Sequence, residues 1–156
     1  MKTKLALFAA TVGVIAAGVP MIAHHSFAAE FDASKGVKLT GTVTKIEWMN
    51  PHTYFYIDVT ELCEGTPATQ GEGRGQVSDW KCTKIDAAQA PNWGLEMGSP
   101  NGLMRQGWTR NSMKVGDVVT VEGSRAKDGT NIGNARSVML SNGQRLFAGS
   151  SQTTNP

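Results

Sequence analysis

The chain has 156 residues, of which 40% are hydrophobic and 18% are charged, with a formal net charge of +2. This small charge and the lack of a basic stripe argue against the phosphate-driven binding of nucleic-acid proteins. The length fits one domain with a sizeable core and argues against a multidomain enzyme.

The N-terminus has the pattern of a cleavable secretory signal. Two lysines precede an apolar run over residues 5–17, and Pro20 follows it. We expect a signal peptide over residues 1–23, cleaved after Ala23, which makes His24 the mature N-terminus. An uncleaved anchor is the alternative, although the run is weakly hydrophobic for a spanning helix. Cleavage leaves 133 residues (156 minus 23) with no membrane span, located in the periplasm or secreted.

The mature chain begins with two expected strands. Residues 37–48 alternate apolar and polar side chains, which is the period of a half-buried strand. The alternation resumes over residues 53–59, with Tyr54 and Tyr56 on the face opposite the apolar side chains. We therefore expect a hairpin around the sequence MNPH at residues 49–52.

The only two cysteines flank a Gly-rich stretch. Residues 63–76 have almost no apolar content, which predicts an extended surface loop. In an oxidising compartment, Cys63 and Cys82 are expected to form a disulfide that closes this loop. Their spacing is not that of a C-x-x-C redox or metal motif.

The second half of the chain predicts one short helix among further strands. Ser99 and Pro100 have the residue types of an N-cap and a first helical position, which predicts a helix over residues 100–106. Asn142 and Gly143 are typical of a tight hairpin turn with positive φ at both central positions, so a last short strand should follow. Other strands are expected over residues 79–85, 92–97, 118–123 and 134–140.

These elements favour an all-β domain over residues 24–149. Five or six short strands, one short helix and no βαβ alternation predict a small antiparallel β-barrel, most specifically an OB-like barrel. The polar residues 150–156 are expected to be a disordered tail.

The three histidines of the chain suggest a metal site. His24 at a free terminus offers its α-amine, with an ordinary pKa of about 8, and an imidazole nitrogen to one metal. A third nitrogen from His52, or from the adjacent His25, would complete a T-shaped site suited to copper. The alternative is a solvated terminus with His52 capping a turn. Soft sulfur for Cu(I) is available from Met49, Met97 and Met104, although core packing is the commoner role of methionine.

The aromatic side chains suggest a second kind of site. An open barrel face would bind a small apolar or carbohydrate-like ligand, with Tyr54 and Tyr56 as the most exposed pair and Trp108 as a further candidate. Core packing is the competing role for these side chains. No nucleophile elbow or phosphate loop is found in the sequence, so an enzyme is not favoured.

Several longer motifs resemble a known family. They are HHSFAAEFD at 24–32, LTGTVTKIEWMNPH at 39–52 and WGLEMGSPNGLMRQGW at 93–108, followed by GDVVTVEGSRAKDG and GNARSV. With these motifs the chain resembles the DUF6152 family of exported bacterial proteins of unknown function. The resemblance implies a periplasmic location and a small β-barrel, and it places all three histidines inside matching motifs. Residues 63–90 look longer than the family pattern, which implies a loop insertion, so the resemblance gives no reason to expect that its disulfide is essential to the shared function.

Three functions follow from these observations. The first is a periplasmic, non-catalytic protein that binds copper through His24 and His52, assisted by His25. The second is a metal-free module that binds a small ligand or a protein through the aromatic face and the short helix. The third is an accessory subunit of a periplasmic oxidoreductase, which requires a protein partner.

Overall fold

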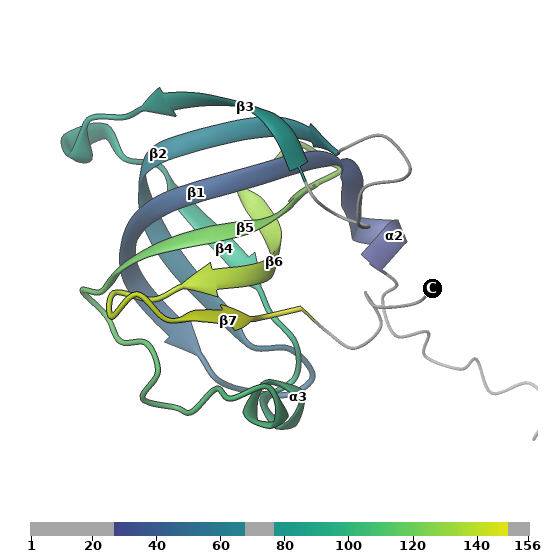
Figure 1. Cartoon of the computed structure of the whole chain (residues 1–156), viewed down its shortest axis with the longest axis vertical. Coiled ribbons are helices and arrows are strands. Elements are labelled where there is room, and N and C mark those ends of the chain that lie inside the picture. Colours follow the sequence, from purple (N-terminus) through teal and green to yellow (C-terminus); the bar gives the residue numbers. More distant parts are fainter. Residues whose placement is uncertain (1–26, 68–76, 150–156) are drawn as a thin grey trace, which may run out of the picture.

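The computed structural model describes residues 27–67 and 77–149 (Figure 1). The expected signal peptide, the predicted tail and the middle of the Gly-rich stretch lie outside the described residues. The elements in chain order are α2 (Phe27–Glu30), β1 (Phe31–Glu47), β2 (Tyr54–Pro67), β3 (Val77–Lys84), the 3-10 turn η1 (Ala87–Gln89), β4 (Asn92–Glu96), α3 (Pro100–Arg105), β5 (Val118–Ala126), β6 (Ile132–Met139) and β7 (Arg145–Phe147).

Five strands form a closed ring of hydrogen-bonded neighbours. The order is β1, β5, β6, β4 and β2, and β2 pairs back with β1. Figure 1 shows these strands wrapped around a common interior, with α3 beyond one end. β3 pairs with the second half of β2, and β7 pairs with β6. The predicted all-β class with a short helix is confirmed.

One pairing in the ring differs from the expected antiparallel arrangement. β4 and β6 run parallel, whereas the other four pairs of the ring are antiparallel. The chain between β4 and β6 contains α3 and β5, which gives the long connection that parallel strands require. The ring is therefore mixed.

The expected alternation is confirmed in the two strands at the start of the domain. Leu39 and Val43 of β1 and Phe55 and Ile57 of β2 are buried in the core. Apolar side chains from every ring strand join them, so the interior of the ring is one hydrophobic core. The polar positions in between face outward and are available for a site.

The Gly-rich stretch is less of a loop than its composition predicts. β2 continues through Pro67 and pairs with β3, so residues 63–67 are strand rather than loop. Cys63 lies directly opposite Cys82 in this pairing, and the predicted disulfide joins them. Backbone pairing and the cross-link hold the two strands together where few apolar side chains are present.

The last hairpin forms where it is expected but with a different turn. Gly143 has a φ of 82°, whereas Asn142 is not among the residues with positive φ, so the prediction of positive φ at both positions is wrong. Instead, the Asn142 side-chain oxygen accepts a hydrogen bond of 2.9 Å from the backbone N–H of Gln144. This side-chain contact stabilises a wider turn, and β7 follows it as predicted.

The short helix α3 begins as its sequence predicts. The Ser99 side chain accepts a hydrogen bond from the backbone N–H of Gly102, and Pro100 occupies the first helical turn.

Candidate functional site

A cleft of about 440 Å³ lies at the corner between β1 and β2. It is built around the sequence MNPH, which forms the turn between the two strands. We call it the corner cleft. Its lining residues are Glu30, Glu47, Met49, Asn50, Pro51, His52, Tyr54, Tyr56 and Glu96.

A row of polar side chains crosses three strands at this cleft. Glu47 of β1 lies opposite Tyr54 of β2, and Tyr54 lies opposite Glu96 of β4. Directly opposed residues in a sheet project from the same face, which brings these side chains together. The row occupies the outward positions that alternate with core residues such as Phe55 and Leu95.

Both tyrosines of the cleft donate hydrogen bonds to glutamates. The Tyr54 hydroxyl donates to Oε2 of Glu96, and the Tyr56 hydroxyl donates to Oε2 of Glu47 at 2.9 Å. Glu96 is only 8% exposed, so Tyr54 supplies a partner to a carboxylate that has lost most of its water. The two pairs therefore fix the walls of the cleft.

His52 is oriented by its Nδ1 atom. Nδ1 lies 3.2 Å from the carbonyl oxygen of Met97 and 3.4 Å from Oε1 of Glu96. A carbonyl oxygen only accepts hydrogen bonds, so this contact assigns the proton of the neutral ring to Nδ1. Nε2 then carries the lone pair, and no hydrogen-bond partner for it is found in residues 27–67 and 77–149. Metal-binding histidines have this arrangement, with one ring nitrogen donating to a carbonyl or carboxylate and the other free to bind.

The tyrosines of the cleft are held in the protonated form. Burial, and then the hydrogen bond to Glu96, raise the pKa of Tyr54 far above its usual range. Burial and the contact with Glu47 raise the pKa of Tyr56 in the same direction. Both shifts favour the neutral phenol beside a carboxylate.

These pKa shifts predict a loss of stability at high pH. The unfolded tyrosines ionise near pH 10, while the folded ones retain their protons, so unfolding is favoured as the pH rises above about 10. Tyr54 and Tyr56 are the only tyrosines of the chain, so ultraviolet absorbance follows them directly. We expect both tyrosines to titrate above pH 10 in the folded protein. In the Tyr54→Phe variant, the free energy of unfolding measured in urea should decrease less steeply as the pH rises above 10. Tyrosines that titrate at their ordinary pKa would contradict this prediction.

The structure places the predicted site residues in different surroundings. His52, Met49 and the half-buried Tyr54 and Tyr56 meet in the corner cleft. His24 and His25 lie outside the described residues. Trp108 is only 2% exposed and donates from Nε1 to the carbonyl oxygen of Phe147, so it belongs to the core rather than to the face that carries the tyrosines.

The three methionines that were candidate soft ligands also lie in different surroundings. Met97 is buried in the core and contributes its backbone carbonyl to His52. Met104 is exposed on α3, and Met49 is exposed in the corner cleft. Met49 is therefore the thioether that lies beside His52.

Two glutamates of the cleft were missed by the sequence reasoning. Glu47, which contacts Lys45 and Tyr56, was not among the candidate site residues. Glu96 was not considered. The sequence feature that could have identified Glu96 is that it is the single charged residue in the otherwise apolar run from Trp93 to Met97.

The profile of a family of unknown function, DUF6152, matches residues 10–72 and 74–135. The chain belongs to the DUF6152 family. The matched segments include all three histidines and every residue that lines the corner cleft. No curated protein and no solved structure matches the chain.

The corner cleft of this DUF6152 protein is lined mainly by polar side chains. It gathers one imidazole, three carboxyl groups, two phenols and one thioether. Within the residues that the structure describes, no group of three or more His, Cys, Asp or Glu side chains is arranged to hold a metal ion. The described helices include none that is long and apolar enough to cross a membrane.

Proposed function

We propose that this DUF6152 protein is a periplasmic, non-catalytic copper-binding protein. Its ligands are the amine and imidazole of His24 at the mature terminus, assisted by His25, and Nε2 of His52 in the corner cleft. The observation that carries the proposal is the orientation of His52, whose Nδ1 lies 3.2 Å from the Met97 carbonyl oxygen. That contact leaves Nε2 as the metal-binding nitrogen.

Covalent geometry supports the participation of the N-terminal histidines. Glu30 lines the same cleft as His52, and His25 precedes Glu30 by five positions in the sequence. Five residues span at most about 18 Å, so the length of the chain allows His25, and His24 one residue further, to reach the cleft.

The surroundings of His52 favour a cation. Glu30, Glu47 and Glu96 line the cleft, and their carboxylates attract positive charge. Met49 is 57% exposed and adds a thioether, a ligand that suits Cu(I). The disulfide between Cys63 and Cys82 fits the oxidising compartment that the signal-like N-terminus implies.

The test is a copper titration of protein purified from the periplasm. Mass spectrometry first determines the N-terminus, and Cu(II) is then added in competition with a chelator. We expect a His24 terminus and one tightly bound copper per chain. The matched control carries one additional glycine before His24, which removes the amine of His24 from the site and should weaken binding. A different terminus, or equal binding by the control, would overturn the proposal.

The same cleft supports a second candidate, a metal-free small-ligand site. Tyr54 and Tyr56 are half-buried along a cleft of about 440 Å³, which lies in the size range of small-molecule sites. If replacement of all three histidines leaves weak copper uptake unchanged, copper is not the ligand and the aromatic wall becomes the surface to test.

A further inference from the structure

A second and larger cleft, of about 710 Å³, lies where β1, β2, β3 and β5 approach the turn after β5. We call it the mouth cleft. Its volume lies within the range of small-molecule sites. It shares no lining residue with the corner cleft. Its charged lining residues are Lys35, Glu64, Asp79, Lys81 and Arg125.

Arg125 lines the mouth cleft and is held in place on two sides. Arg125 follows Val119 and Val121 in the alternation of β5, and these two valines face the core. The guanidinium lies over the ring of Trp93 at 5.2 Å, and Trp93 is only 2% exposed. Nη2 donates to the carbonyl oxygen of Gly129 at 3.0 Å. A guanidinium fixed by a ring and a carbonyl is preorganised for a planar anion.

The donors of Arg125 are not all used. A guanidinium has five N–H donors, and two of its nitrogens make hydrogen bonds: Nη2 to Gly129, and Nη1 to Oε1 of Glu64 at 3.2 Å. Nε is buried and has no partner in the part of the chain that the structure describes. Because Nε is covered by the protein, the donors of Arg125 that a ligand can reach are the N–H groups of Nη1 and Nη2.

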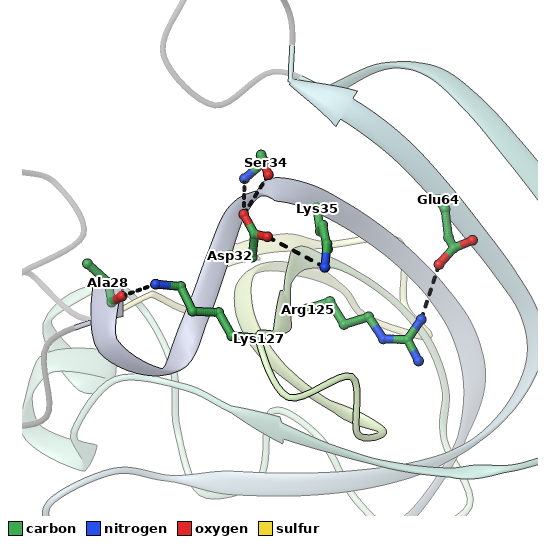
Figure 2. A network of polar contacts seen from close by, with 7 residues as sticks. All are labelled: Ala28, Asp32, Ser34, Lys35, Glu64, Arg125 and Lys127. Carbon is green, nitrogen blue, oxygen red and sulfur yellow. Dashed lines mark hydrogen bonds and ion pairs between the residues drawn. The ribbon is translucent and has the colours of Figure 1, made fainter.

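Glu64 is a weakly held partner for Arg125. Its side chain is 61% exposed, and Figure 2 shows Arg125 extending from β5 towards it on β2. Exposed ion pairs of this kind contribute little stability, so another carboxylate can take the place of Glu64. Lys35, which also contacts Asp32 at 3.7 Å, and Lys81 add positive charge to the same cleft.

We propose that the mouth cleft binds a small organic carboxylate. Its carboxyl oxygens accept hydrogen bonds from Nη1 and Nη2 of Arg125 in place of Glu64, and Lys35 and Lys81 supply the remaining positive charge. Arginine forms such paired bonds with carboxylates because its donors lie in one plane. This site is independent of the copper proposal.

The test uses the mature protein and succinate as the probe. The NMR signal of the Arg125 Nε–H group is followed at constant ionic strength, with inorganic phosphate and chloride as comparison anions. We expect a saturable shift with succinate. In the variants, which are followed by the backbone amide signals of β5, Arg125→Gln should weaken succinate binding about tenfold or more, the scale of one charge-assisted contact. Arg145→Gln is the matched control, because Arg145 pairs with Glu122 at 2.6 Å outside the cleft.

Glu64→Gln provides a second variant that does not depend on the fold tolerating loss of Arg125. It removes the competing carboxylate from an exposed position, so succinate should bind several-fold more tightly. The absence of a saturable Arg125 shift would overturn the proposal. So would equal binding of phosphate, equal losses in the two arginine variants, or weaker succinate binding by Glu64→Gln.

Discussion

Replacing His52 with asparagine is expected to lower the copper affinity of the mature protein by about 100-fold or more. Loss of a partner that only orients a metal ligand costs 10- to 100-fold in affinity, so loss of the ligand itself should cost at least the upper figure. The asparagine N–H still reaches the carbonyl oxygen of Met97, which His52 contacts at 3.2 Å. The variant therefore removes Nε2 and preserves the corner.

The control for this prediction is Tyr56→Phe. It removes a hydrogen bond of 2.9 Å to Glu47 in the same cleft but no proposed copper ligand. Chelator competition should separate the two variants, with near-normal copper affinity for Tyr56→Phe. Urea denaturation shows whether both remain folded. A His52→Asn protein that binds copper as tightly as the unmodified one would remove His52 from the site.

The sequence predicts the strands well because their signal is local. The alternation of Leu39 and Val43 with polar neighbours, and the Ser99-Pro100 helix start, need no knowledge of the rest of the fold. The parallel pairing of β4 with β6 and the extension of β2 to Pro67 were not predicted. Both depend on which strands meet in the closed ring, and composition does not carry that information.

The sequence analysis named His52, Met49, Tyr54 and Tyr56 of the corner cleft but not the contacts that orient His52. His52 was identified from its residue type and its place in the MNPH turn, but its partners Glu96 and Met97 are more than 40 residues away in the sequence. Glu96 came into the cleft because β4 pairs with β2 and sets it opposite Tyr54. Residue type therefore finds a candidate ligand, whereas the contacts that orient it follow from strand register.

Strand register also underlies the largest stability change that we expect, which is in Gly123→Ala. The pairing of β5 with β6 shifts register between Glu122 and Gly123. A Cβ at Gly123 would lie 1.9 Å from the carbonyl oxygen of Asn134. That oxygen belongs to a ring strand and cannot move without opening the ring. We expect a loss of about 3 kcal/mol or more in the free energy of unfolding, measured by urea denaturation.

Gly116→Ala is the comparison that identifies the cause. Gly116 has a φ of 93° and nothing within 4 Å of its Cβ position, so its replacement tests backbone conformation alone and should cost about 1–2 kcal/mol. Equal losses in the two variants would contradict the steric explanation.

Because Asn134 lies opposite Glu96 in β4, a displacement of β6 by Gly123→Ala should also disturb the carboxylate beside His52. Weaker copper binding by folded Gly123→Ala protein would then link the close approach of β5 and β6 to the geometry of the corner cleft.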